Sequence, residues 1–156
     1  MPSAVEIRDG DLLLRPWNAD DAEAVGLTPG SSEIGQYFGA PLDGFGDLDP
    51  DAPSFTIVAG DQPIGRIWFA AWKRPFEVGY FLRPDTWGRG LATRSLRLVS
   101  DWLLAEGERA IVLCTQPGNE RSQRVAERAG YRREGEVVEY ARVKDGTTRA
   151  LRYVYP

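Results

Sequence analysis

The segment at residues 83–93, Arg-Pro-Asp-Thr-Trp-Gly-Arg-Gly-Leu-Ala-Thr, constrains the fold of this chain more than any other. An alternating apolar run precedes it and a long amphipathic run follows it, so the pattern predicts a strand, a glycine loop and a helix. The first N–H groups of a helix have no main-chain partner and lie at the positive end of its dipole, which favours an anion. Gly88 and Gly90 allow a phosphate to approach the main chain closely, and Arg89 adds a positive charge. The sequence therefore predicts a phosphate-binding loop.

Two common phosphate motifs do not fit this loop. A dinucleotide-binding fingerprint requires a third glycine three residues after Gly90, where the chain has Thr93. A P-loop requires four residues between its glycines, followed by Lys-Ser or Lys-Thr, and no lysine follows this loop. A dinucleotide-binding enzyme and a nucleotide-binding switch protein are therefore both disfavoured.

The length and composition favour one folded domain, residues 1–156. The hydrophobic fraction of 42% and the five tryptophans are typical of a folded globule. No apolar run is long enough to span a membrane, no signal-peptide pattern is visible, and Cys114 has no second cysteine with which to pair. We therefore expect a cytoplasmic protein that does not contact membranes. The sequence does not distinguish a monomer from a homodimer, so both are expected as alternatives.

Histidine is absent from the chain, and this excludes several kinds of chemistry. Ser-His-Asp and Cys-His catalytic systems cannot form, and neither can zinc sites built on histidine or on several cysteines. No calcium-loop spacing appears either, so we expect no metal site.

Charge is distributed unevenly along the chain. Residues 1–53 contain 11 Asp or Glu and two Arg, whereas residues 54–156 contain 12 Asp or Glu and 17 Lys or Arg. This asymmetry suits an enzyme that binds a cationic amine on one side and a polyanionic cofactor on the other, although two ordinary solvated surfaces explain it equally well. No concentrated basic run exists, so we expect no nucleic acid partner.

Alternation and helical periodicity predict the order of the elements. Strands are expected in a hairpin at 5–15 and at 55–59, 64–72, 77–83, 110–115, 136–143 and 149–155, and helices at 18–27, 31–38, 89–106 and 119–129. Short turns join the strands between 55 and 83 into an antiparallel meander, and strand, helix and strand at 77–115 form a crossover with two parallel strands.

The glycine loop resembles the pyrophosphate-binding loop of the Gcn5-related N-acetyltransferases (GNAT), which reads Gln/Arg-x-x-Gly-x-Gly/Ala. The glycines match at Gly88 and Gly90, whereas the leading position is Asp85. The run Trp-Gly-Arg-Gly-Leu-Ala-Thr is more similar to the ribosomal-protein acetyltransferase branch (RimJ/RimL-like), where this departure is common. A second stretch, Asn-Glu-Arg-Ser at 119–122 followed by Ala-Gly-Tyr at 129–131, resembles the family's Asn-x-x-Ser and Gly-Phe/Tyr motif.

This resemblance implies an α/β fold of the α+β type. A central mixed, mostly antiparallel sheet of about six or seven strands is expected, with helices on both faces and the order β-α-α-β-β-β-α-β-α-β-β. It also implies that the chain binds acetyl-CoA as its cosubstrate. The implied cofactor-binding residues are Phe81, Leu82, Arg83, Trp87, Gly88, Arg89, Gly90, Leu91, Ala92, Thr93 and Asn119.

The reaction requires a free amine, a site for the oxyanion and a proton for the departing thiolate. Glu77 is the candidate base, because it lies on the strand that the resemblance places beside the acetyl group, and a solvent-facing residue is the alternative. The resemblance also implies that N–H groups after Gly79, around Phe81 and Leu82, hold the pantetheine arm of the coenzyme. In the family this strand splays from its neighbour there, which frees an N–H group for the oxyanion. Many GNAT enzymes use a tyrosine seven positions after the motif asparagine as the acid, but here that residue is Ala126. Ser122 stands where the RimL-like branch is thought to use a serine near the thiolate.

The resemblance indicates an acetyl-CoA-dependent N-acetyltransferase that acts by direct attack in a ternary complex. A protein N-terminal α-amine is the acceptor that the RimJ/RimL-like branch implies. A small amine such as an amino sugar, a polyamine or an antibiotic remains an alternative, as does a module that binds acyl-CoA without turnover.

Several residues have two interpretations from sequence alone. Gly79 marks either a bulge or a close approach to a ligand, and Arg94 either reaches a phosphate or is solvated. Trp68 and Trp72 belong either to the core or to the amine pocket. Asn119 caps a helix, contacts the cofactor, or does both.

Overall fold

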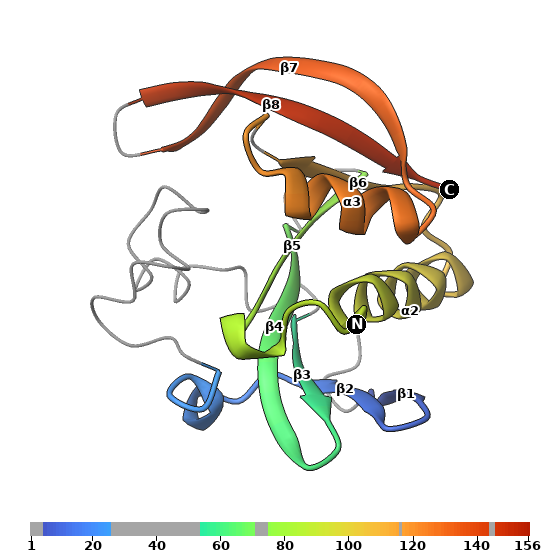
Figure 1. The fold of residues 1–156 in the computed structure, drawn as a ribbon. Coiled ribbons are helices and arrows are strands. Elements are labelled where there is room, and N and C mark those ends of the chain that lie inside the picture. The colour runs from blue at the N-terminus through green and yellow to red at the C-terminus, as the bar shows by residue number, and fades with distance from the viewer. Residues whose placement is uncertain (1–4, 26–53, 71–74, 116, 144–145) are drawn as a thin grey trace.

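The computed structural model describes residues 5–25, 54–70, 75–115, 117–143 and 146–156, and only the main chain of residues 19, 70, 137–143 and 146–148. Within these residues, one sheet of eight strands has the order β1-β2-β3-β4-β5-β6-β8-β7 (Figure 1). The strands are β1 (Ile7–Asp9), β2 (Leu12–Pro16), β3 (Ser54–Ala59), β4 (Gln62–Ala70), β5 (Phe76–Leu82), β6 (Ile111–Thr115), β7 (Arg132–Val143) and β8 (Gly146–Tyr155). Among the described strands, β5 and β6 are the parallel neighbours, and the other pairs are antiparallel.

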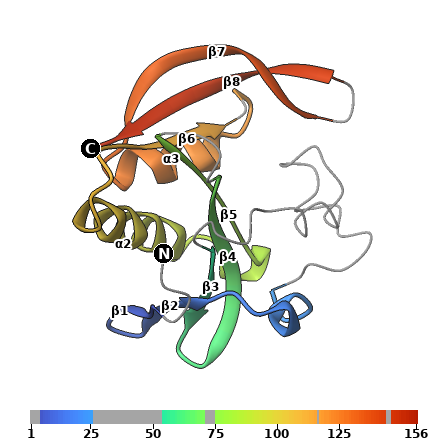
Figure 2. The same ribbon diagram turned by 180° about the vertical axis from the view of Figure 1, so that it is seen from behind.

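Two α-helices, α2 (Leu91–Ala105) and α3 (Glu120–Arg128), lie beside each other on one face of the sheet (Figures 1 and 2). Leu96, Val99 and Leu103 recur at helical spacing on α2 and are fully buried. They belong to one core cluster with apolar residues of β2 to β6, and Ala126 and Ala129 join it from the region of α3. No helix in the described part of the chain is long and apolar enough to cross a bilayer.

The side chains of β5 alternate between the two faces of the sheet. Phe76, Val78 and Leu82 belong to the core cluster under the helices, and Tyr80 packs against it. Because side chains alternate along a strand, Glu77, Gly79 and Phe81 lie on the opposite face. This division confirms the alternation expected from the sequence.

The opposite face contains a polar cluster as well as apolar residues. Arg15 forms a bidentate ion pair with Asp21 at 2.6 and 2.9 Å, and the Thr56 hydroxyl donates to the same carboxylate at 2.7 Å. Asp21 lies at the end of the 3₁₀ helix η1 (Ala19–Asp21), so this cluster holds η1 against the sheet. The Arg15 guanidinium, which donates two hydrogen bonds, lowers the pKa of the Asp21 carboxyl below its ordinary value.

Strands β5 and β6 separate at their carboxyl ends. They pair only from Phe76 and Ile111 to Val78 and Leu113, although β5 continues to Leu82 and β6 to Thr115. The last four residues of β5 therefore pair with β4 alone. This separation opens the sheet beside the start of α3.

The expected α+β arrangement with a mixed, mostly antiparallel sheet is confirmed. The described sheet has eight strands rather than the six or seven that the resemblance implies, because both strands of the hairpin expected at 5–15 pair into it. The helix predicted at 31–38 lies outside the described residues, and the described part of the segment 18–27 contains η1.

Candidate active site

The glycine loop has the conformation that its sequence requires. Gly88 and Gly90 have φ angles of +83° and +72°, in the left-handed region that residues with a Cβ atom rarely adopt. A Cβ atom at either position would meet no protein atom within 4 Å, so both glycines border open space. Arg89 between them is exposed. The loop therefore presents bare main chain and one cation to solvent.

The N-terminus of α2 lacks the features that would satisfy its free N–H groups. Its N-cap residue is Gly90, which has no side chain to accept a hydrogen bond, and its first turn contains no acidic residue. At the start of α3, by contrast, the Asn119 side chain accepts from the Ser122 N–H at 3.2 Å, and Glu120 lies in the first turn. An anion at the start of α2 would meet unpaired N–H groups and the positive end of the dipole.

Trp87 ties the glycine loop to two neighbouring elements. Its indole N–H donates to the main-chain carbonyl of Leu82 at 3.1 Å, and the guanidinium of Arg121 lies 3.6 Å from its ring centroid. The guanidinium of Arg83 forms an exposed ion pair with Asp85 at 2.6 Å. Arg83 is thus paired within the segment, and Arg89 is the exposed cation between the two loop glycines.

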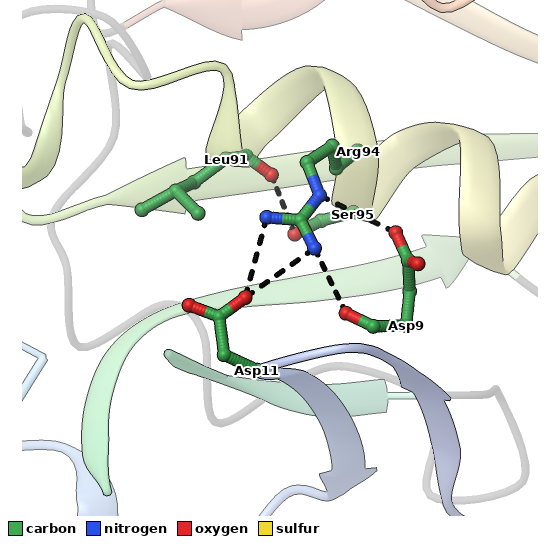
Figure 3. A network of polar contacts seen from close by, with 5 residues as sticks. All are labelled: Asp9, Asp11, Leu91, Arg94 and Ser95. Carbon is green, nitrogen blue, oxygen red and sulfur yellow. Dashed lines mark hydrogen bonds and ion pairs between the residues drawn. The ribbon is translucent and has the colours of Figure 1, made fainter. Parts of the chain in front are cut away.

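Arg94 does not point toward the glycine loop. Its guanidinium donates to the carboxylate of Asp9 at 3.3 Å and to the main-chain carbonyl of Asp9 at 2.8 Å, and it also contacts Asp11 at 3.5 Å (Figure 3). The Ser95 hydroxyl beside it donates to the Leu91 carbonyl at 2.7 Å. Arg94 therefore joins α2 to the β1–β2 hairpin, which is neither of the roles considered from sequence.

The free edge of β5 offers specific main-chain donors toward β6. The Arg83 N–H bonds to the Ile64 carbonyl of β4 at 2.7 Å. Because main-chain groups point to alternate sides along a strand, Phe81 also directs its N–H toward β4, whereas Tyr80 and Leu82 direct theirs away from it. Tyr80 and Leu82 therefore present N–H groups on the side where β6 has separated.

Tyr80 and Ser122 meet across this opening. Their hydroxyl oxygens are 3.2 Å apart, which joins β5 to the first turn of α3. Burial raises the pKa of the Tyr80 phenol to about 12, although the contact with Ser122 and the charge of Arg121 oppose the shift. Tyr80 therefore remains protonated at neutral pH. Tyr80 is not among the residues predicted from sequence, and the available signal was a hydroxyl on an otherwise apolar strand face.

Thr115 contributes a second hydroxyl at the opening. It lies at the end of β6, beyond the last pair with β5, and is 6% exposed. Its side chain shares a face with the core residues Ile111 and Leu113, so it is on the same side of the sheet as Tyr80. Its hydroxyl has no hydrogen-bond partner among the described residues. A buried, unpaired hydroxyl costs about 1–3 kcal/mol, so a ligand that bonds to Thr115 would relieve this cost.

Glu77 occupies the other face of the sheet. It is 6% exposed and lies opposite Ala70 of β4 and Val112 of β6. Trp68 covers the neighbouring Gly79, where a Cβ atom would come within 2.5 Å of the indole ring. Gly79 therefore permits close approach of Trp68, which is itself buried at 2% exposure. Trp72 lies outside the described residues.

The structure thus gathers most of the predicted residues at one place, but it places Glu77 and Phe81 on the opposite face of the sheet, with the Phe81 N–H directed toward β4. The glycine loop, Leu82, Asn119 and Ser122 lie on or beside the opening between β5 and β6, together with Tyr80, Thr115 and Arg121, which sequence reasoning missed. Glu77 approaches from the opposite face. Open glycines, an uncapped helix start and an unpaired buried hydroxyl fit a long ligand with a phosphate group.

A family model described as the acetyltransferase (GNAT) domain matches residues 11–132 of the chain. The chain therefore belongs to the GNAT acetyltransferase family, and it is an N-acetyltransferase. The expected family membership is thereby confirmed.

Solved structures of acetyltransferases share the fold. A GNAT-family acetyltransferase from Bacillus anthracis has a TM-score of 0.82 at 22% identity, covering 97% of this chain and 98% of its own. RimL, the ribosomal L7/L12 alpha-N-protein acetyltransferase, in complex with coenzyme A has a TM-score of 0.79 at 18% identity, covering 97% of both chains. The microcin C7 self immunity acetyltransferase MccE, in complex with acetyl-CoA and AMP, has a TM-score of 0.73 at 17% identity, covering 99% of this chain and 97% of its own.

Proposed function

We propose that this N-acetyltransferase transfers the acetyl group of acetyl-CoA directly to the α-amine of a protein N-terminus. One observation carries the cofactor assignment. The uncapped start of α2, preceded by two open glycines with positive φ, lies next to the edge where β5 has lost its neighbour. A helix start attracts the pyrophosphate of acetyl-CoA, and an open strand edge bonds to the amides of its pantetheine arm.

The proposed path of the coenzyme follows from the order of these features. The pyrophosphate is bound by the main chain at residues 88–93, with Arg89 as the nearby cation. The pantetheine arm then runs back along β5, where Leu82 and Tyr80 offer N–H groups and Thr115 offers its unpaired hydroxyl. The thioester is thereby brought to the point where β5 and β6 join, at Val78 and Leu113. A free N–H of β5 at this point stabilises the oxyanion.

The two catalytic tasks are assigned to opposite faces of the sheet. Glu77 accepts the proton of the attacking amine, through a water molecule, from the face that Trp68 covers. Ser122 stabilises the departing thiolate from the face that the helices cover. In this arrangement the base acts on the amine and the hydroxyl acts on the sulfur, from different sides of the acetyl group.

The acceptor is proposed on chemical grounds and on the sequence resemblance to the RimJ/RimL-like branch. Freeing a lysine amine at pH 7 costs about 4–5 kcal/mol, whereas an α-amine costs about 1.5 kcal/mol. Among the described residues, the buried Glu77 suits the easier task. Among the structures with this fold, RimL is described as an alpha-N-protein acetyltransferase.

The test combines titration calorimetry with a thiol-release assay. Wild-type protein is expected to bind acetyl-CoA, and the double variant Gly88→Asp with Gly90→Asp is expected to lose binding, because the carboxylates repel the pyrophosphate. The matched control is Gly60→Asp with Gly107→Asp, which also have positive φ angles of +61° and +107° and open surroundings. This control introduces the same charge and similar backbone strain away from the glycine loop. If it is folded, the control variant should therefore bind acetyl-CoA as the wild type does.

Thiol release is then measured with peptides that have a free α-amine, with acetylated peptides that contain lysine, and with small amines. Release with α-amine peptides alone supports the proposal. Release with a small amine alone assigns a small-molecule acceptor instead. Binding of acetyl-CoA without release in any mixture identifies a non-catalytic module, and absence of binding overturns the cofactor assignment.

A further inference from the structure

We propose that Tyr80 is a positioning residue for the leaving thiolate, and that it holds the Ser122 hydroxyl so that the proton of Ser122 points toward the sulfur. This inference rests on the proposed function and adds a residue to it. Tyr80 lies on the free edge of β5, and Ser122 lies in the first turn of α3. Their hydroxyl contact of 3.2 Å spans the opening along which the coenzyme arm is proposed to run.

Either oxygen of this contact could be the donor, and the proposal assigns the donor role to Tyr80. Its phenol stays protonated far above neutral pH, because burial raises its pKa to about 12. A hydroxyl has one proton to donate and can accept two, so Ser122 can accept from Tyr80 and still donate its own proton elsewhere. The Ser122 N–H is held by the Asn119 side chain at 3.2 Å, which fixes the turn that carries the hydroxyl.

Tyr80 does not itself transfer a proton to the sulfur. A thiol has an ordinary pKa of about 8.5, so a phenol at about 12 keeps its proton in preference to the thiolate. In the proposed step the amine nitrogen bonds to the carbonyl carbon, the carbon–sulfur bond breaks, and its electron pair goes to sulfur. The ammonium proton passes to Glu77 through water, and the thiolate accepts a hydrogen bond from Ser122 until solvent protonates it.

The geometry also supplies an internal control. Tyr131 and Ser100 form a second tyrosine–serine hydroxyl pair, with the oxygens 2.6 Å apart, between α2 and the residue that precedes β7; this pair is buried, whereas the Tyr80–Ser122 pair is half-buried. Loss of the Tyr131 hydroxyl removes a similar bond within the helix layer. A purely structural role for Tyr80 predicts that Tyr80→Phe and Tyr131→Phe have the same effect on coenzyme binding. The positioning role predicts that only Tyr80→Phe alters the interaction of the protein with the coenzyme sulfur.

The experiment is titration calorimetry of CoA and of desulfo-CoA, which lacks the sulfur, from about pH 6 to about pH 9. In the wild type the affinity for CoA relative to desulfo-CoA should rise about tenfold with pH, because a site that prefers thiolate lowers the pKa of the bound thiol. In Tyr80→Phe and Ser122→Ala the ratio of the CoA affinity to the desulfo-CoA affinity should stay nearly constant across this pH range. In Tyr131→Phe this ratio should rise with pH as it does in the wild type. Arg121 lies near this site and remains in all variants, so its charge cannot explain a difference between them.

Steady-state rates complete the test. Tyr80→Phe and Ser122→Ala should each lower kcat about tenfold or more with little change in KM for acetyl-CoA, and the double variant should lose no more than Ser122→Ala alone. Equal pH dependence in wild type and Tyr80→Phe, or independent losses in the double variant, would overturn the inference. Failure of both CoA and desulfo-CoA to bind would instead overturn the proposed function.

Discussion

The indole nitrogen of Trp87 lies 3.1 Å from the main-chain oxygen of Leu82, so the glycine loop is bonded to the strand edge that precedes it. Arg121 covers the same ring from α3 at 3.6 Å. One side chain thus fixes the loop relative to both the strand and the helix that border the opening. We therefore expect a change at Trp87 to weaken binding at the glycine loop.

Trp87→Phe keeps an aromatic ring under Arg121 but removes the hydrogen bond to Leu82. A typical hydrogen bond contributes about 1 kcal/mol, so we expect acetyl-CoA affinity to fall about fivefold, with a small loss of stability. Calorimetric titration measures the affinity. Trp17→Phe is the matched control, because Trp17 stacks on Arg66 at 4.2 Å on the other face of the sheet. Equal loss of affinity in both variants would contradict the assigned role of Trp87.

Thr115→Val should make the free protein more stable and the complex weaker. Valine has nearly the shape of threonine, and the substitution removes the unpaired buried hydroxyl. We expect unfolding to become harder by about 1 kcal/mol, which raises Tm by about 2–4 °C, while acetyl-CoA affinity falls several-fold. Calorimetric unfolding with and without acetyl-CoA measures both effects. Thr56→Val is the control: Thr56 donates to Asp21, so this change should destabilise the protein. If Thr115→Val instead lowers the stability of the free protein, the Thr115 hydroxyl must have a hydrogen-bond partner in the wild type.

Glu77→Gln should lower kcat without changing acetyl-CoA affinity. General base catalysis typically contributes about 10²–10⁴-fold, and glutamine preserves the shape of the side chain while removing its basicity. Initial rates with an α-amine peptide measure the effect, and circular dichroism verifies folding because Glu77 is buried. Glu127→Gln on α3 is the control. Activity within threefold of the wild type would mean that the amine arrives deprotonated and needs no base.

Asp21→Asn should destabilise the protein in a pH-dependent way. The pKa of Asp21 is lowered in the folded state, chiefly by the hydrogen bonds from Arg15. Its ionised form therefore stabilises the fold at any pH above its ordinary value, and this stabilisation is lost as the pH falls through the lowered pKa. We expect a loss of about 1–3 kcal/mol at pH 7 that shrinks toward zero in strong acid.

Urea unfolding of wild type and Asp21→Asn at several pH values measures this loss. Asp20→Asn is the control: its side chain is exposed, and the change should alter stability by less than about 0.5 kcal/mol. A gap between wild type and Asp21→Asn that stays constant as the pH falls would show that the charge of Asp21 is not responsible.

Short-range patterns in the sequence predicted strands and helices, because these elements depend on residues that are close together in the chain. The period of two along β5 separated Glu77 and Gly79 from Val78 and Tyr80, and the structure confirms that division. The helix expected at 89–106 is present as Leu91–Ala105, and it begins one residue after the second loop glycine because Gly90 has a left-handed conformation.

Contacts between distant segments could not be predicted in this way. Tyr80 and Ser122 are 42 residues apart, and they meet only because α3 packs beside the separated end of β5. Arg94 was considered for phosphate binding because of its place on the helix. The β1–β2 hairpin supplies carboxylates at Asp9 and Asp11, 85 and 83 residues away along the chain, and these pair with Arg94 instead.

The separation of β5 from β6 also divides the sheet mechanically. Strands β1 to β5 form one antiparallel unit and β6, β8 and β7 form another, and three register pairs between β5 and β6 continue the described sheet from one unit to the other. Amide hydrogens in the two units can therefore exchange through separate local openings in the free protein. A coenzyme arm that bonds to both sides of the opening would act as an additional strand and couple the units, so that binding raises the cooperativity of unfolding as well as its midpoint.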